Sequence, residues 1–130
     1  MITSPYEKYR QSSVTTSTPS QLLIMLYDGA IRFIRGGIEG IKERDFDKTN
    51  TLLNKAQAIV TELMVTLDHS YEISQNLTSL YDYINRQLLQ ANVKKEAAPA
   101  EEALGYLLEL REAWVQAAKL TGATAEGAHE

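Results

Sequence analysis

The 130-residue sequence contains no cysteine and only two histidines. The absence of cysteine excludes a disulfide framework and a thiolate metal site, and it is typical of proteins from reducing compartments. There is no cluster of basic residues and the formal net charge is −4, which argues against nucleic acid as a partner. The first residues, MITSPYEKYRQSS, lack the apolar core of a signal peptide. We therefore expect a soluble, cytoplasmic protein.

Enzymatic motifs are missing as well. A phosphotransfer bundle needs an exposed histidine in mid-helix, whereas His69 lies at an expected helix end and His129 lies in the tail. A di-iron bundle needs Glu-x-x-His pairs, and the chain has none. The stretch GGIEG is no phosphate-binding loop, because it continues a helical pattern and no Lys-Ser or Lys-Thr follows it. We expect no catalytic residue, no metal site and no cofactor.

The chain does contain four segments with helical periodicity, over residues 19–44, 45–68, 72–93 and 99–120. The start of the first helix is marked by Thr18 as a cap, by Pro19 at the first helical position and by Gln21, which completes a capping box. Asp45 is expected to cap the second helix, and Pro99 is expected to open the fourth. No strand pattern and no internal repeat is visible.

The last three segments each show one apolar stripe with the spacing of a helix that buries one face. The stripes are Leu52, Ala56, Ile59, Val60, Leu63 and Leu67; Ile73, Leu77, Leu80, Tyr81, Ile84, Leu88 and Ala91; and Leu104, Leu107, Leu108, Trp114, Val115 and Ala118. Because the links are short, the pattern predicts an all-α fold, an antiparallel up-down four-helix bundle over residues 18–120. Residues 1–17 are expected to form a flexible N-terminal arm, and residues 121–130 a disordered tail.

The first helix has more apolar residues than one buried face requires. On a wheel of about 100° per residue, the core stripe is Leu23, Leu26, Ala30, Phe33, Ile34, Gly37 and Ile41. A narrow polar strip holds Asp28, Arg32, Arg35 and Glu39. These charges make membrane insertion costly. One facet beside the strip is Ile24, Ile31 and Ile38, and the other is Leu22, Met25, Gly29, Gly36 and Gly40.

Two interpretations of these facets are open. Neighbouring helices of the same bundle could cover them, with the glycines marking a tight crossing. Alternatively, the facets form a docking groove for a partner segment, since each glycine costs a helix about 0.5–1 kcal/mol relative to alanine. We favour the groove. We then expect the isoleucine facet to be partly exposed, and Gly36→Leu to leave the bundle folded while it weakens partner binding.

The N-terminal arm carries three apolar residues in a polar background, Tyr6, Tyr9 and Val14. It is either a frayed terminus or a segment that docks through its tyrosines. A tether of about a dozen residues to the first helix gives an effective concentration of order millimolar. Weak docking would therefore be enough for the arm to cover an apolar groove while no partner is bound.

Two classes of function remain from the residues alone. One is a helical chaperone or adaptor that receives an apolar segment. The other is a self-assembling structural bundle, whose extra facets are permanent oligomer interfaces. A permanent oligomer stays assembled at nanomolar dilution, whereas a chaperone would be monomeric or weakly dimeric.

Several motifs together resemble one known family. The N-terminal part reads Tyr6-x-x-Tyr9-Arg10, Val14, Thr16-Ser17-Thr18-Pro19, Gln21-Leu22 and Met25-Leu26-Tyr27-Asp28-Gly29-Ala30. Later pieces are AQAIVTELMVTL at residues 56–67, Asn76-Leu77, Leu80-Tyr81-Asp82-Tyr83-Ile84 and residues 88–92. In this order, over residues 6 to about 120, they resemble the flagellar export chaperone family FliS. The chain has Ser-Thr-Pro where the family more often has Ala-Ser-Pro, and the fourth helix matches loosely beyond Trp114.

The resemblance implies a four-helix bundle that binds the C-terminal segment of newly made flagellin in the bacterial cytoplasm. Binding would block premature polymerisation and help to deliver flagellin to the type III export gate. The client groove would comprise Leu22, Ile24, Met25, Gly29, Ile31, Gly36, Ile38, Gly40, Tyr83 and Leu89. The arm residues Tyr6, Tyr9 and Val14 would cap the empty groove, and the tyrosine positions would contact the export gate when the chaperone is loaded.

Overall fold

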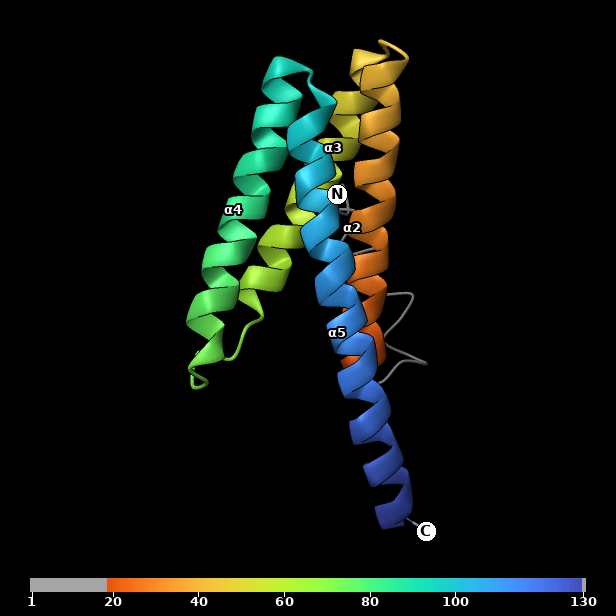
Figure 1. Cartoon of the computed structure of the whole chain (residues 1–130), viewed down its shortest axis with the longest axis vertical. Helices are drawn as coiled ribbons and strands as arrows, with labels where there is room; N and C mark the ends of the chain where they lie inside the picture. The colour runs from red at the N-terminus through yellow and green to blue at the C-terminus, as the bar shows by residue number, and fades with distance from the viewer. Residues whose placement is uncertain (1–18, 130) are drawn as a thin grey trace, which may run out of the picture.

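The computed structural model describes residues 19–129, with side chains described for residues 19–120. Its four α-helices are α2 (Pro19–Lys42), α3 (Phe46–Val65), α4 (Ile73–Lys94) and α5 (Ala97–His129). Neighbours in space follow the cyclic order α2, α3, α4, α5, and consecutive helices run in opposite directions (Figure 1). No strand occurs among the described residues. The predicted all-α, up-down four-helix bundle is confirmed.

The helix boundaries lie close to those expected from the sequence. The carboxylate of Asp45 accepts a hydrogen bond from the Lys48 backbone N–H at 3.2 Å, as expected of an N-cap. α5 begins at Ala97, so Pro99 lies in the first turn, where the helix needs no N–H donor. α5 also continues to His129, past residue 120, after which a disordered tail was expected. The predicted arm lies outside the described residues, and the division into arm, bundle and tail stays a prediction.

The core consists largely of the apolar stripes that the sequence pattern indicated, but Tyr27 and Leu53 are fully buried although neither was expected there. Its largest fully buried side chains are Tyr27, Tyr81, Ile34, Leu53, Ile59, Leu63, Ile84, Leu88 and Leu107. Two expected core positions are wrong, because Ile73 is 62% exposed and Leu108 is 38% exposed. Ile73 is the first residue of α4, beyond the part of the helix that its neighbours cover. Leu108 follows the buried Leu107 in the sequence and is rotated from it by about 100° around the helix axis.

The α2–α3 turn and the α4–α5 turn lie at the same end of the bundle, which we call the closed end (Figure 1). Arg44 in the first turn and Lys95 in the second have left-handed backbones, with φ of 59° and 56°. Each turn returns a backbone N–H to the preceding helix, in the first case from Asp45 to the Gly40 carbonyl at 2.8 Å. The chain therefore reverses with few residues, and the helices start their packing directly at the turns.

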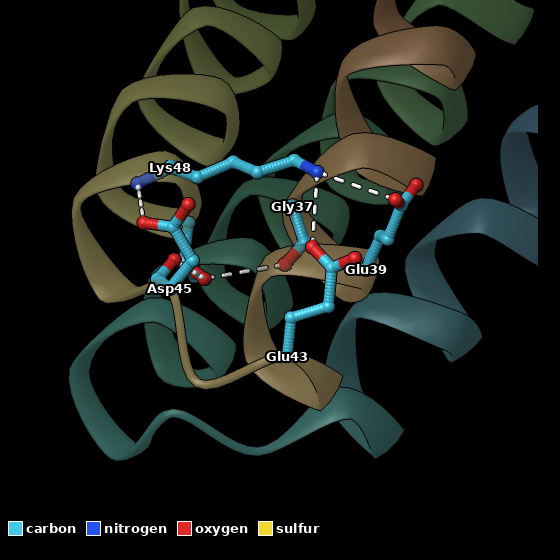
Figure 2. A network of polar contacts seen from close by, with 6 residues as sticks. Gly37, Glu39, Glu43, Asp45 and Lys48 are labelled. Atoms are coloured by element: carbon cyan, nitrogen blue, oxygen red, sulfur yellow. Dashed lines mark hydrogen bonds and ion pairs between the residues drawn. The ribbon is translucent and has the colours of Figure 1, made fainter.

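Charged side chains also connect elements at the closed end. The Lys48 ammonium lies 3.3 Å from a carboxylate oxygen of Glu39 and 3.2 Å from one of Glu43 (Figure 2). Lys42 of α2 lies 3.7 Å from Glu101 of α5. Since these pairs are substantially exposed, each contributes at most about 1 kcal/mol, and they mainly fix the register of neighbouring helices.

Helix α3 crosses tightly over the glycines of α2. A Cβ on Gly40 would lie 2.6 Å from the Thr49 hydroxyl oxygen and 3.0 Å from the Asp45 carbonyl oxygen. A Cβ on Gly36 would lie 2.5 Å from a methyl carbon of Leu52. The expectation of an open trough that tolerates Gly36→Leu is therefore wrong. The glycines serve the alternative interpretation, a close crossing within the bundle itself, and Gly29 is buried too.

Two of the three residues of the isoleucine facet are covered as well, which corrects the expectation of partial exposure for them, whereas Ile24 is half-buried as expected. Ile31 is 5% exposed and Ile38 is 7% exposed. Both lie on the side of α2 whose residues Asp28 and Lys42 contact α5. Burial of each isoleucine contributes about 1.5–3 kcal/mol to stability, which favours the packing of α5 against this side of α2. The wheel placed the facets correctly but did not show that α2 has a neighbour on both sides.

Candidate functional site

At the other end of the bundle, the α3–α4 pair diverges from the α2–α5 pair (Figure 1). We call this end of the bundle the open end. It carries the first residues of α2 and the link between α3 and α4, which is longer than the two turns at the closed end. Two apolar pockets open at this end, one between α2 and α5 and one between the two helix pairs; we call them chambers and refer to them together as the groove. This groove is the candidate site.

The α2–α5 chamber has a volume of about 270 Å³. Its lining residues are Pro19, Ser20, Leu23, Trp114, Ala117 and Ala118. The α3–α4 chamber has a volume of about 260 Å³. Its lining residues are Leu23, Leu63, Thr66, Leu67, Asp68, Tyr71, Ile73, Ser74, Leu77, Tyr81 and Trp114. Leu23 and Trp114 line both chambers and therefore form the wall between them.

The lining carries little charge. Among the described residues, Asp68 is the one charged residue that lines either chamber. Its carboxylate accepts hydrogen bonds from the Ser70 hydroxyl at 2.6 Å and from the Ser70 N–H at 3.0 Å, which hold the pKa of Asp68 below its ordinary value. Its carbonyl accepts a hydrogen bond from the Ser74 hydroxyl. The link is thus ordered by its own polar groups, and the groove suits apolar side chains.

A polar bridge inside the bundle holds the dividing wall. Tyr27 of α2 and Tyr81 of α4 are 0% and 1% exposed, and their hydroxyls are hydrogen-bonded to each other. The indole N–H of Trp114 on α5 donates to the Tyr27 hydroxyl at 3.0 Å. Burial raises the pKa of both tyrosines, so their hydroxyls stay neutral at physiological pH. The bridge joins three helices at the bottom of the groove.

An ion pair lies next to this bridge. The Arg111 guanidinium donates from Nε to one Asp28 oxygen and from Nη2 to the other at 3.4 Å. Arg111 lies one helical turn before Trp114, and Asp28 follows Tyr27. The two side chains are about a third and two-fifths exposed, so the pair contributes about 1 kcal/mol or less. Its geometry fixes the rotation of α5 against α2.

The predicted site residues on α4 are exposed but lie outside the groove. Tyr83 is 41% exposed and Leu89 is 52% exposed. The Tyr83 hydroxyl donates to Glu102 of α5 at 2.7 Å, a bond that raises the pKa of Tyr83. Its ring meets Tyr106 edge to face, with centroids 6.0 Å apart. Both residues lie off the core stripe, as expected, and their contact with a client stays a prediction.

None of the ten predicted groove residues lines a chamber. Leu22, Ile24 and Met25 come nearest, because they are half-buried in the first turns of α2 on either side of Leu23. Gly29, Ile31, Ile38 and Gly40 are buried within the bundle, and Gly36 is half-buried against α3. The arm residues Tyr6, Tyr9 and Val14 lie outside the described residues.

The sequence reasoning assigned the true lining residues Leu23 and Trp114 to the core. Their periodicity is that of core residues, and nothing in it marks the place where two helix pairs part. The sequence contained one feature that could have indicated the open end. Tyr71 and Ile73 are large apolar residues at a helix break, and they are 65% and 62% exposed.

The described part of the chain has neither a cluster of metal-binding side chains nor a helix suited to span a membrane. No three His, Cys, Asp or Glu residues there are grouped so that they could hold a metal ion. Among the helices described, none combines the length and the apolar character that crossing a membrane requires.

Comparison with known proteins gives a consistent picture. A family model described as "Flagellar protein FliS" matches residues 2–121. The flagellar secretion chaperone FliS of Bacillus subtilis (strain 168) is 42% identical over 116 residues, which cover 89% of this chain and 87% of the relative. The protein of the same name from Salmonella typhimurium is 38% identical over 109 residues, covering 82% and 81%. That from Escherichia coli (strain K12) is 31% identical over 107 residues, covering 80% and 79%.

Proposed function

The chain belongs to the FliS family of flagellar secretion chaperones, and from this premise we propose that it binds the C-terminal segment of flagellin in the groove at its open end. In this proposal, binding occurs in the bacterial cytoplasm, prevents premature polymerisation of flagellin and precedes delivery to the type III export gate. The family is a chaperone family, which is not an enzyme class.

The observation that carries the proposal is the two-chambered apolar groove at the open end. Such a groove fits an amphipathic helix that lays its apolar face between other helices. A client that is disordered before binding loses about 2–5 kcal/mol to its own ordering. Several shallow apolar contacts can offset that loss without one deep anchor, and two chambers of similar volume supply them.

The rim of the groove adds further contacts to this proposal. Leu22, Ile24 and Met25 are half-buried beside Leu23, and we retain them as client contacts. We also retain Tyr83 and Leu89 for a client that continues over the outer surface of α4. The glycine and isoleucine positions that are packed against α3 and α5 offer no surface to a client, and we do not retain them.

We further propose that the N-terminal arm covers this groove while no client is bound. Pro19, the first residue of α2, lines the α2–α5 chamber, so the arm is tethered directly at the groove. Tyr6, Tyr9 and Val14 supply the apolar surface, and a tyrosine tolerates both burial and water. A client would displace the arm, and its tyrosines would then contact the export gate.

Deletion of residues 1–13 tests this cap. We expect the truncated chain to bind an isolated flagellin C-terminal peptide more tightly and to self-associate more strongly, because the groove is left uncovered. Unchanged peptide affinity, together with unchanged NMR signals of groove residues, would rule out the cap. The chaperone proposal would stand in that case.

Co-expression tests the chaperone proposal itself. We expect the chain to co-purify with flagellin that carries its C-terminal segment, and not with flagellin that lacks it. Equal recovery of both forms, or of neither, would contradict the proposal. The alternative of a self-assembling bundle rested on two uncovered facets of α2, but Gly36 and Gly40 of one facet are packed against α3, and Ile31 and Ile38 of the other are buried. At nanomolar dilution, the mass of the protein should accordingly be that of a monomer or a weak dimer.

A further inference from the structure

Trp114 has an unusual position at the groove. Together with Leu23 it lines both chambers, so its ring separates two apolar spaces that would otherwise be one. The chambers have volumes of about 270 and 260 Å³. An apolar cavity of about 150 Å³ is already large enough for benzene. Each chamber therefore has room for at least one large apolar side chain.

The ring is held in place by hydrogen bonds at the bottom of the groove. Its N–H donates to Tyr27 at 3.0 Å, and Tyr27 is hydrogen-bonded in turn to Tyr81. A swing of the indole would leave a buried hydroxyl without one of its partners, which is unfavourable. The Arg111–Asp28 pair fixes α5 one turn earlier. The wall is consequently preorganised in the empty groove.

We propose that Trp114 is a specificity-determining residue of the client groove. It requires an amphipathic helix that presents two apolar side chains on one face, one for each chamber. A segment with the same composition but with its apolar residues out of helical register can fill only one chamber and binds more weakly. This inference rests on the proposed function, because it specifies which feature of the flagellin segment the groove selects.

The test uses the full chain and two synthetic peptides without tryptophan. One is the C-terminal segment of flagellin from the same organism. The other has the same composition, with its apolar residues moved out of helical register. Trp114 is the single tryptophan of the chain, so its fluorescence reports on the wall directly. We expect the native peptide to change the fluorescence and to bind at least about tenfold more tightly than the shuffled one.

Two variants and a matched control complete the test. Trp114→Ala joins the chambers, and we expect the discrimination between the peptides to fall at least threefold. Ala117→Leu fills the α2–α5 chamber, and we expect it to lower the affinity for the native peptide about tenfold. Ala113→Leu is the control, since Ala113 is exposed on the same helix and lines neither chamber. It should change neither quantity.

The outcomes separate the two proposals. If the wild-type chain binds the native peptide without a change in Trp114 fluorescence, or if Ala117→Leu binds like Ala113→Leu, the role of Trp114 is refuted and the chaperone function stands. If the wild-type chain binds neither peptide, the proposed function fails and this inference fails with it. Should Trp114→Ala not fold, the fluorescence and the Ala117→Leu comparison still decide the matter.

Discussion

At the closed end, α2 and α3 approach each other closely over the glycines of α2. At the open end, α2 and α3 belong to different helix pairs, and these pairs diverge (Figure 1). Close contact at Gly36 and Gly40 leaves no space for a further side chain. At the open end, Trp114 and Leu23 stand between two chambers. The helices are thus clamped where the turns are short and spread where the link is long.

The polar groups of the two ends differ in the same way. Those at the closed end are exposed ion pairs and left-handed turns, which set register and direction. The open end instead has a buried bridge of Tyr27, Tyr81 and Trp114. Buried polar groups are costly unless they are satisfied, so this bridge ties the helices at one fixed separation. The closed end is thus held by close packing and short turns, whereas the open end holds the groove that we propose for the client.

Gly40→Ala should have the largest effect. The new Cβ would meet backbone atoms of α3 and its cap, which cannot rotate away. We expect a loss of about 3 kcal/mol of unfolding free energy, measured by denaturant titration. Gly36→Ala should cost less, because Leu52 can move a methyl group. If Gly40→Ala proves as mild as Gly36→Ala, the closed end is not tightly packed.

Tyr27→Phe breaks the bridge at the open end. The Trp114 N–H and the Tyr81 hydroxyl would lose their shared partner, and we expect a loss of about 1–3 kcal/mol in unfolding free energy. Tyr83→Phe is the matched control, since it removes an exposed hydroxyl bonded to Glu102. Its effect should stay within about 0.5 kcal/mol. Equal effects of the two variants would show that the buried bridge adds no more than a surface contact.

Alkaline pH should act on the same bridge. Because the pKa of Tyr27 and of Tyr81 is raised in the folded state, the unfolded chain releases these protons first. Their contribution is therefore complete below about pH 10, the ordinary tyrosine pKa, and is lost as pH rises further. Above that pH, each tyrosine should lower the free energy of unfolding by about 1.4 kcal/mol per pH unit. The slope should be smaller in Tyr27→Phe, and an identical slope would contradict this assignment.

Ile73→Ser compares the two ends on one helix. Ile73 lines the groove at the start of α4, whereas Val93 lies near the closed end, and both are exposed, at 62% and 74%. We expect Ile73→Ser to weaken binding of the flagellin peptide about tenfold, or 1.4 kcal/mol, with little change in stability. Val93→Ser should leave the affinity unchanged. Equal losses would mean that the client does not prefer the open end.

Gly105→Ala should have the smallest effect and the opposite sign. Nothing lies within 4 Å of the position of the new Cβ. Alanine should therefore add about 0.5–1 kcal/mol of stability through helix propensity alone, measured as a higher denaturation midpoint. Peptide affinity should not change. A loss of affinity would reveal a partner contact on the outer face of α5, away from the open end.

Much of the fold could be read from local patterns. Asp45 caps α3 because a carboxylate next to backbone N–H groups is a local interaction, and the spacing of its neighbours is enough to reveal it. The stripe on α4 from Leu77 to Ala91 is buried for a similar reason, since helical periodicity brings these residues to one face. Ile73 belongs to the same stripe and is exposed, because it lies where the helix pairs part.

The candidate site was harder to predict. Its lining comes from the start of α2, the end of α3, the start of α4, the link between α3 and α4, and the middle of α5. No single segment carries that combination, and Trp114 has the periodicity of an ordinary core residue. The glycines of α2 were ambiguous for a related reason. A missing side chain has the same sequence signature whether a client or a neighbouring helix approaches it.

The sequence by itself determined that this protein is helical, approximately where its four helices begin, and which family it resembles, because these depend on interactions and motifs within short stretches. Only the tertiary structure decided that α3 packs against Gly36 and Gly40 and that Ile31 and Ile38 are buried on the side of α2 that faces α5. It also decided where an apolar surface stays open. Helical periodicity gives the direction of each side chain but not the neighbour it meets, since that depends on how far apart the helices lie at each level of the bundle.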